Sequence, residues 1–288
     1  MTMFASPEDA RTRLSAVDYL TDPQIATAVF LADALGKPLL IEGPAGVGKT
    51  ELAKAVAAAT SSELIRLQCY EGLDEARALY EWDYRKQLLR IQAGVDGWDD
   101  ARAGIFAEEF LLARPLLTAI RRDEPTVLLI DETDKADVEV EGLLLEVLSD
   151  FQVTIPELGT ISATRRPFVV LTSNATRELS EALKRRCLYL YIDYPTPERE
   201  RDIVLARVPG IREQLAEQVV RTVASLRALE LKKAPSIAET LDWARTLIAL
   251  SADDLDEDVI AQTLGVVLKH VADHTRVAKE LGLSGIGG

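Results

Sequence analysis

The sequence has few of the residues that build disulfide or zinc frameworks. Only two cysteines occur among its 288 residues, Cys69 and Cys187, so at most one disulfide is possible and no metal-finger spacing exists. We expect both to pack as small apolar residues. The two histidines, His270 and His274, are four residues apart on an expected helix. They lack the glutamate of a zinc-protease motif and an evident third ligand, which favours a solvated helix face.

Long apolar runs and a surplus of basic charge are also missing. No stretch approaches the roughly 18 apolar residues of a membrane span. The N-terminal segment has acidic residues by position 9 and no continuous apolar core, unlike a signal peptide. We therefore expect a cytoplasmic protein with no membrane span. The 33 basic against 47 acidic residues give a net charge of −14, which disfavours a phosphate-neutralising surface and a nucleic-acid partner.

Apolar patterning alternates strands with helices up to about residue 194. Proline after a capping residue, at Ser6-Pro7 and Asp22-Pro23, predicts two N-terminal helices. Short apolar runs predict five strands, and strands that alternate with helices indicate an α/β fold with a parallel sheet. We expect the strands at residues 38–42, 64–69, 126–131, 168–174 and 188–193, and helices at 49–60, 106–122 (with Pro115 as a kink) and 138–150.

Two segments depart from this alternation. Residues 151–164 alternate apolar and polar side chains around Pro156 and Gly159, as a β-hairpin does. From about residue 195 no further apolar β-run occurs, which predicts an all-helical domain. We therefore expect an α/β domain over residues 1–194 and a helical domain over residues 195–288.

A phosphate-binding motif lies between the first predicted strand and the helix that follows it. Glycines in such a loop let backbone N–H groups point at phosphates, and the start of the helix adds its positive dipole end. A lysine supplies a charge, and a threonine places a hydroxyl where Mg²⁺ would lie. The motif G-x-x-x-x-G-K-[ST] is matched by Gly43-Pro44-Ala45-Gly46-Val47-Gly48-Lys49-Thr50. Its strand–loop–helix context predicts a nucleotide site.

Polar residues at two later strand ends complete a hydrolytic set. Asp131 ends the third strand and is expected to reach Mg²⁺ through water, and Glu132 would orient and polarise the attacking water. Asn174, after the fourth strand, would hold that water or touch the γ-phosphate. Arg185 and Arg186 end a short helix and are either a surface basic pair or groups supplied to a neighbouring subunit's nucleotide.

With these residues assembled, the chain resembles the AAA+ ATPases, specifically the MoxR branch. GPAGVGKT as Walker A, LLIDE as Walker B, the hairpin, TSN as sensor 1 and a C-terminal helical lid follow in family order. The hairpin between Leu148 and Phe168 is typical of the pre-sensor-1 insertion clade. The segments YEGLDEARALYEWDYRKQLLRIQAG, DFQVTIPELGTI and KAPSIAETLDWAR resemble the CoxD-type accessory ATPases of carbon monoxide dehydrogenase and molybdenum hydroxylase maturation.

The resemblance implies a fold and an activity. The fold is that of the P-loop NTPases, with a five-stranded parallel sheet core, a pre-sensor-1 β-hairpin and a C-terminal all-helical lid. The activity is that of a remodelling chaperone that hydrolyses ATP with Mg²⁺. The expected partners are further copies of the chain in a ring of six, a von Willebrand factor A-type adaptor protein and a client metalloenzyme. The alternatives are an AAA+ motor or loader acting on nucleic acid, which the acidic charge disfavours, and a nucleotide-gated scaffold with negligible turnover.

The resemblance also assigns roles to individual residues. The arginine finger falls on Arg186, with Arg185 as the alternative. The family's sensor-2 arginine is missing, because Ser236-Ile237-Ala238 has alanine at its place. Either another basic residue of the lid substitutes or the lid senses nucleotide differently; the candidate substitutes are Lys232, Lys233 and Arg245.

The long connection at about residues 70–105 corresponds to the family's helix-2 insert, which projects at the ring face or pore. Its aromatic residues Tyr80, Trp82 and Tyr84 either contact a partner polypeptide or pack the insert onto its own domain. We favour packing, because aromatics at such spacing more often do so.

Overall fold

The computed structural model describes residues 2–92 and 104–281. Its contacts divide the chain into two compact units. The first contains residues 1–43 and 49–191, and the second contains residues 44–48 and 192–288.

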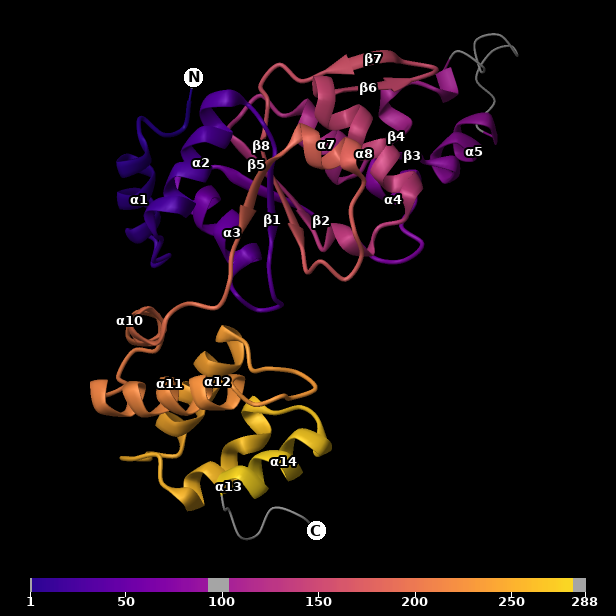
Figure 1. The fold of residues 1–288 in the computed structure, drawn as a ribbon. Coiled ribbons are helices and arrows are strands. Elements are labelled where there is room, and N and C mark those ends of the chain that lie inside the picture. The colour runs from indigo at the N-terminus through magenta and orange to yellow at the C-terminus, as the bar shows by residue number, and fades with distance from the viewer. Residues whose placement is uncertain (1, 93–103, 282–288) are drawn as a thin grey trace. The chain divides into compact units, whose positions relative to one another are not determined.

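A five-stranded parallel sheet forms the centre of the first unit, so the predicted fold class is confirmed (Figure 1). In spatial order the strands are β2 (Glu63–Gln68), β5 (Thr126–Asp131), β8 (Phe168–Ser173), β1 (Leu39–Glu42) and β9 (Leu188–Tyr191). Every residue of β5 and β8 is buried, as expected for central strands covered on both faces. Because the strands are parallel, the carboxyl ends of β2, β5, β8 and β1 lie side by side at one edge.

Helices cover both faces of this sheet (Figure 1). On one side lie α1 (Pro7–Ser15), α2 (Pro23–Leu35) and α3 (Lys49–Ala59), and on the other lie α7 (Pro115–Arg121) and α8 (Val138–Asp150). Ser6 and Asp22 cap α1 and α2 as predicted, because their side-chain oxygens accept backbone N–H groups of the first turn. The short helix α9 (Glu181–Arg186) precedes β9. The predicted hairpin is also present, as β6 (Gln152–Ile155) and β7 (Gly159–Ser162).

The prediction of one helix over residues 106–122 is wrong. A 3₁₀ turn, η1 (Glu108–Phe110), and a strand, β4 (Leu111–Ala113), precede α7, which begins only at Pro115. Pro115 therefore starts a helix and does not kink one, because its fixed φ and missing N–H suit the first helical turn. Strand β4 pairs antiparallel with β3 (Tyr80–Trp82), a ladder that the sequence pattern did not predict.

The aromatic residues near this ladder do not all face the same environment. Trp82 is only 8% exposed, and its ring meets Tyr80 and Phe106 edge-on at centroid distances of 6.4 and 5.4 Å. Trp82 and Tyr80 thus pack onto their own unit, as favoured above, whereas Tyr84 is 62% exposed. The flanking helices are α4 (Glu75–Ala78) and α5 (Tyr84–Gln92). The remaining predicted insert, residues 93–103, lies outside the described residues.

Beyond residue 196, the described part of the second unit consists of helices joined by loops and contains no strand. Its helices are α10 (Pro197–Arg207), α11 (Glu213–Arg227), α12 (Ile237–Ala249), α13 (Glu257–Val267) and α14 (Val271–Leu281). Trp243 of α12 is fully buried among apolar residues of α11, α13 and α14, and it donates its indole N–H to Thr263 Oγ1 at 2.7 Å. Arg227 of α11 donates to both carboxylate oxygens of buried Glu200 in α10 at 2.5 and 2.9 Å.

Among residues 2–92 and 104–281, no cluster of three or more His, Cys, Asp or Glu could hold a metal ion. His274 instead contacts the Leu268 carbonyl through Nε2 at 3.1 Å. In the same ranges, no helix combines the length and apolarity needed to cross a membrane.

Candidate nucleotide site

The glycine-rich loop joins β1 to α3, and α3 begins at Lys49. Three of its residues have positive φ, with values of 152° for Gly43, 75° for Gly46 and 97° for Gly48. Only glycine adopts such angles without strain. The motif's glycines therefore stand where the backbone itself requires them.

Lys49 connects the loop with the end of β8. Its side chain is buried, and its Nζ donates to the Gly43 carbonyl at 2.7 Å and to Asn174 Oδ1 at 2.8 Å. Burial lowers the pKa of Lys49, and the carboxylates of Asp134, Asp131 and Glu132 partly offset that effect. The structure thus brings Lys49 and Asn174 together, although they are far apart in the sequence.

Asp131 is buried at the end of β5 and receives three hydrogen bonds. Its Oδ1 accepts from Thr50 Oγ1 at 3.0 Å and from Thr172 Oγ1 at 2.6 Å, and its Oδ2 accepts from the Arg66 guanidinium at 2.5 Å. The two residues predicted to hold Mg²⁺, Thr50 and Asp131, are therefore in contact. Their hydroxyl and carboxylate oxygens are the ligand types that Mg²⁺ prefers, so they fit this ion.

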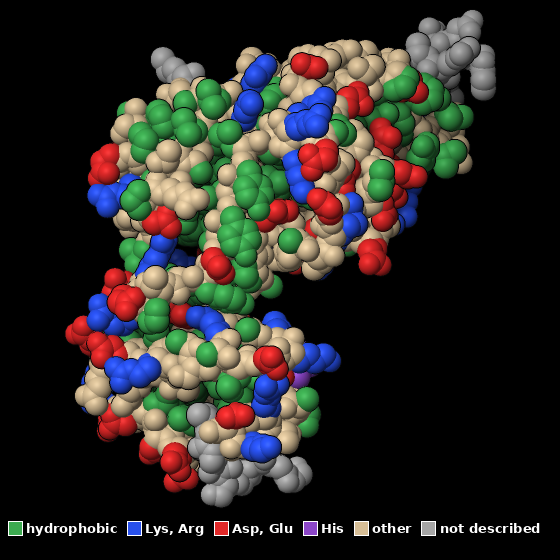
Figure 2. Space-filling model, viewed as in Figure 1, with side chains coloured by type: hydrophobic (Ala, Val, Ile, Leu, Met, Phe, Trp, Pro, Cys, Tyr) green, Lys and Arg blue, Asp and Glu red, His purple; other side chains and the backbone are tan. Residues whose placement is uncertain are grey.

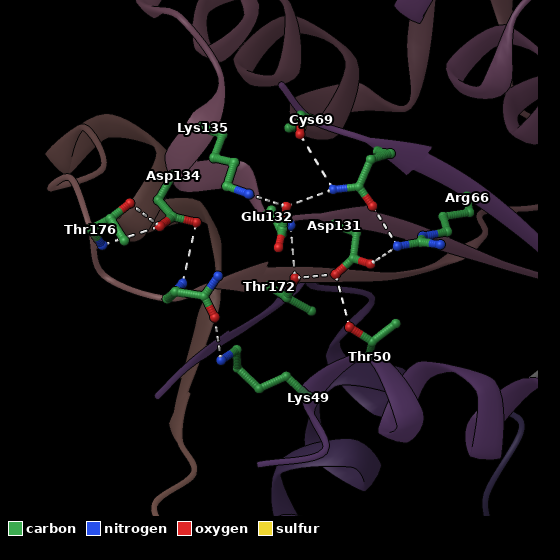
Figure 3. A network of polar contacts seen from close by, with 12 residues as sticks. Lys49, Thr50, Arg66, Cys69, Asp131, Glu132, Asp134, Lys135, Thr172 and Thr176 are labelled. Atoms are coloured by element: carbon green, nitrogen blue, oxygen red, sulfur yellow. Dashed lines mark hydrogen bonds and ion pairs between the residues drawn. The ribbon is translucent and has the colours of Figure 1, made fainter. Parts of the chain in front are cut away.

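Glu132 follows Asp131 in the left-handed backbone region, with φ of 57°. Its N–H donates to Thr172 Oγ1 at 2.9 Å, so one hydroxyl contacts both acids. Its Oε2 accepts from Gln68 Nε2 at 2.9 Å and from Lys135 Nζ at 2.6 Å (Figure 3). The carboxylate predicted to act on water is thus held by two donors.

The contacts of the two acids include four residues that the sequence reasoning missed: Arg66, Gln68, Lys135 and Thr172. Gln68 and Thr172 stand at or near the ends of strands that flank β5, so the order of the sheet would have indicated them. That order depends on pairing between distant segments.

The two candidate finger residues lie in the last turn of α9 and are exposed. Arg186 Nε donates to Ser149 Oγ of α8 at 2.6 Å. Arg185 makes no side-chain hydrogen bond or ion pair with any residue in the described ranges. In the described part of the chain, neither arginine forms a hydrogen bond or ion pair with Glu132.

Of the candidate sensor-2 substitutes, Lys232 and Lys233 precede α12 and Arg245 lies within it. Ser236 and Glu239 form a capping box at the start of α12. Lys233 Nζ pairs with Glu239 at 3.1 Å and Arg245 with Asp242 at 3.0 Å, whereas Lys232 donates its backbone N–H to buried Asp273 at 2.8 Å. Two of the three side chains are thus paired with nearby carboxylates.

Comparison with known protein families shows to which family the chain belongs. Residues 38–187 match the AAA domain (dynein-related subfamily). The chain belongs to the AAA+ ATPase family. Members of this family bind nucleotide at the P-loop and commonly form ring oligomers.

Several curated proteins are similar to this AAA+ ATPase. It is 27% identical over 224 residues to the uncharacterized protein SH1500 of Staphylococcus haemolyticus, covering 75% of this chain and 78% of that one. It is 26% identical over 236 residues to the chaperone ClpB of Staphylococcus aureus, covering 75% and 25%. It is 32% identical over 139 residues to the Clp protease ATP-binding subunit ClpL of Lactococcus lactis, covering 47% and 16%. The chain thus spans a quarter or less of these Clp proteins.

Solved structures show the same fold at lower sequence identity. Two mutant forms of RuvB from Thermotoga maritima superpose with TM-scores of 0.53 and 0.54 at 19% and 17% identity. The first match covers 99% of this chain and 80% of the RuvB chain, and the second covers 96% and 79%. At this identity the likeness supports the architecture alone.

Proposed function

We propose that this AAA+ ATPase is of the MoxR type and hydrolyses Mg-ATP to remodel a client metalloenzyme during maturation or cofactor insertion. The client class that the CoxD-like segments suggest is a molybdenum hydroxylase such as carbon monoxide dehydrogenase. The observation that carries hydrolysis is the position of Glu132, directly after Asp131 at the edge where Lys49 meets Asn174. A protein that only binds nucleotide needs no such carboxylate.

Each residue of the site has a part in this reaction. Residues 43–50 would hold the phosphates, and Thr50 and Asp131 would hold Mg²⁺, Asp131 partly through water. The bound ion would neutralise phosphate charge as a Lewis acid. The Glu132 carboxylate would orient a water and accept its proton as that water's oxygen bonds to the γ-phosphorus and the bond to the β–γ bridging oxygen breaks. Asn174 would contact the γ-phosphate or the water through its amide.

Other subunits and partners complete the proposed machine. In a ring, expected to be a hexamer, Arg186 or alternatively Arg185 would reach the nucleotide of a neighbouring subunit. Residues 1–194 would act as the ATPase core and residues 195–288 as its lid, which leaves client recognition to inserts, ring faces and a von Willebrand factor A-type adaptor. The similarity to the chaperones ClpB and ClpL supports work on a protein.

Charge argues against a nucleic-acid motor. The chain carries a net charge of −14. On the face shown in Figure 2, Lys and Arg are interspersed with Asp and Glu and form no continuous basic stripe. A DNA-tracking surface needs a continuous basic footprint.

The decisive experiment is Glu132→Gln. We expect kcat for ATP to fall at least about a hundredfold while nucleotide affinity is retained, because the amide cannot accept the water's proton. Glu139→Gln, which changes an exposed glutamate of α8, is the matched control. Undiminished turnover in the Glu132 variant would reject the assignment, and turnover strongly raised by duplex DNA at moderate salt would favour the motor.

The client is tested separately. A molybdenum hydroxylase and a von Willebrand factor A protein are co-expressed with the wild-type chain or with the Glu132→Gln variant, and cofactor occupancy of the hydroxylase is measured. We expect occupancy to depend on the wild-type chain. Equal occupancy with both would reject this client.

A further inference from the structure

Asp134 is a buried acid to which the proposed reaction gives no role. It lies in the 3₁₀ turn η2 (Thr133–Lys135), two residues after Glu132, and is 3% exposed. Its Oδ1 accepts the Asn174 N–H at 3.2 Å, and its Oδ2 accepts the Thr176 N–H at 3.1 Å and the Thr176 hydroxyl at 2.5 Å (Figure 3). Burial alone would raise the pKa of Asp134, but these hydrogen bonds hold it below its ordinary value.

The bonds to Asp134 close a tight turn after β8. Asp134 accepts the N–H groups of Asn174 and Thr176. Ala175, which lies between them, has φ of 55°, a backbone region that residues other than glycine rarely adopt. Such a conformation persists only where the surroundings enforce it. Asp134 bonds on both sides of Ala175, and the Ala175 N–H donates to Ser173 Oγ at 2.9 Å. The turn that carries Asn174 is therefore held by Asp134 of η2, the 3₁₀ turn that follows β5.

The same turn presents Asn174 to the nucleotide loop. Its Oδ1 accepts from Lys49 Nζ at 2.8 Å, so Asn174 is fixed at its backbone by Asp134 and at its amide by Lys49. We propose that Asp134 is a positioning residue that sets the Asn174 amide for the γ-phosphate or the attacking water. This proposal rests on the function proposed above for Asn174.

An ionised carboxylate is the group this position needs. All three contacts to Asp134 are donors, and two of them are backbone N–H groups that cannot reverse. A carboxylate accepts on both oxygens, whereas an asparagine would turn its NH₂ toward one of the N–H groups. Asp134→Asn thus conserves shape but loses one side of the clamp.

The test is a double-mutant cycle of Asp134→Asn and Asn174→Ala in the full chain. Steady-state ATPase assays give kcat and KM, and equilibrium binding of a fluorescent ADP analogue gives affinity. We expect Asn174→Ala to lower kcat about 10- to 100-fold, and Asp134→Asn to lower it about tenfold with little change in KM or in affinity for the analogue. In the Asn174→Ala background, Asp134→Asn should cost less than about twofold. The matched control is Asp150→Asn, at an exposed acid.

Two results would overturn the proposal. The first is an unchanged kcat for Asp134→Asn. The second is a full loss that persists in the Asn174→Ala background, because Asp134 would then act independently of Asn174. The proposed function fails separately, in the Glu132→Gln assay: if that variant retains turnover, the hydrolytic role of Glu132 is wrong, whatever the Asp134 variants show.

A second variant covers the case in which Asp134→Asn does not fold. Thr176→Val removes only the hydroxyl donor and leaves both backbone donors in place. We expect it to lower kcat about two- to threefold, with that loss absent in the Asn174→Ala background. Persistence of the loss there, or no loss at all, would count against the clamp.

Discussion

Thr172 donates its hydroxyl hydrogen to Asp131 Oδ1 across 2.6 Å, from one buried strand end to the next. The Thr172 hydroxyl oxygen in turn accepts the Glu132 N–H at 2.9 Å. The Thr172 hydroxyl on β8 thereby fixes the positions of two groups. These are the side chain of Asp131, proposed to hold Mg²⁺, and the backbone of Glu132, proposed to act on water.

Replacement of this hydroxyl by a methyl group should impair both catalysis and stability. Thr172→Val keeps the shape but leaves the Glu132 N–H without its acceptor, an unsatisfied group that costs about 1–3 kcal/mol when buried. We expect kcat to fall about tenfold as the acids lose their alignment. Steady-state ATPase assays at saturating Mg²⁺ measure this, and Thr172→Ser, which retains the hydroxyl, should stay near the wild-type rate. Equal losses in both variants would contradict the argument.

Substitutions of the two arginines of α9 should have different effects on ATPase activity when each variant is mixed with the wild-type protein. If Arg186 reaches a neighbour's nucleotide, Arg186→Ala should lower turnover about a thousandfold and inactivate wild-type sites beside it. Arg185→Ala is the matched substitution one residue away and should act weakly. Titration of each variant into the wild-type protein, with ATPase activity as readout, distinguishes them. A strictly additive decline for Arg186→Ala would reject the role in trans, and the reverse pattern would transfer it to Arg185.

The insert aromatics should differ in their contribution to stability. Trp82→Ala removes a ring that is 8% exposed and should lower the free energy of unfolding by about 3–5 kcal/mol. Tyr84→Ala removes a ring that is 62% exposed and should change it by less than about 0.5 kcal/mol. Chemical denaturation followed by circular dichroism measures both. A destabilised Tyr84 variant would show that this ring is covered in the folded protein.

Both thiols should resist labelling in the folded state. Burial raises the pKa of the Cys69 and Cys187 thiols to about 12, well above their ordinary value. At pH 8 we therefore expect slow reaction with a thiol reagent, and two thiols per chain after unfolding. The raised pKa also means that the unfolded chain loses protons first, so stability should fall as pH rises from about 9 toward 12. Fast labelling of the native protein would contradict this expectation. In a Cys187→Ser variant, the labelling rate of Cys69 can be measured alone.

Local signals were sufficient where one segment determines its own structure. Ser6 and Asp22 before proline marked two helix starts, and the unbroken apolar runs of β5 and β8 marked strands that are buried on both faces. The glycine motif was readable because its strand and helix adjoin it. These features depend on neighbouring residues, which the sequence displays directly.

Features that depend on contacts between segments far apart in the sequence could not be predicted from local patterns. Leu111–Ala113 reads as part of a helix, yet it becomes a strand because it meets Tyr80–Trp82. Thr172 and Asp134 look like ordinary strand-end and turn residues. Their contacts span about 40 positions of sequence and follow from the order of strands in the sheet.

The ladder of β3 and β4 also bears on how this ATPase can vary. Trp82 faces Leu111 across the ladder, and the Asp83 N–H donates to the Phe110 carbonyl at 2.7 Å, so the chain leaves and re-enters the core at nearly one point. The entropic cost of closing a loop between fixed ends grows only slowly with its length. The length of the connection between Asp83 and Phe110 can therefore change at small cost to the hydrolytic core, provided that Phe106, whose ring meets Trp82, and the buried Gln87 are kept.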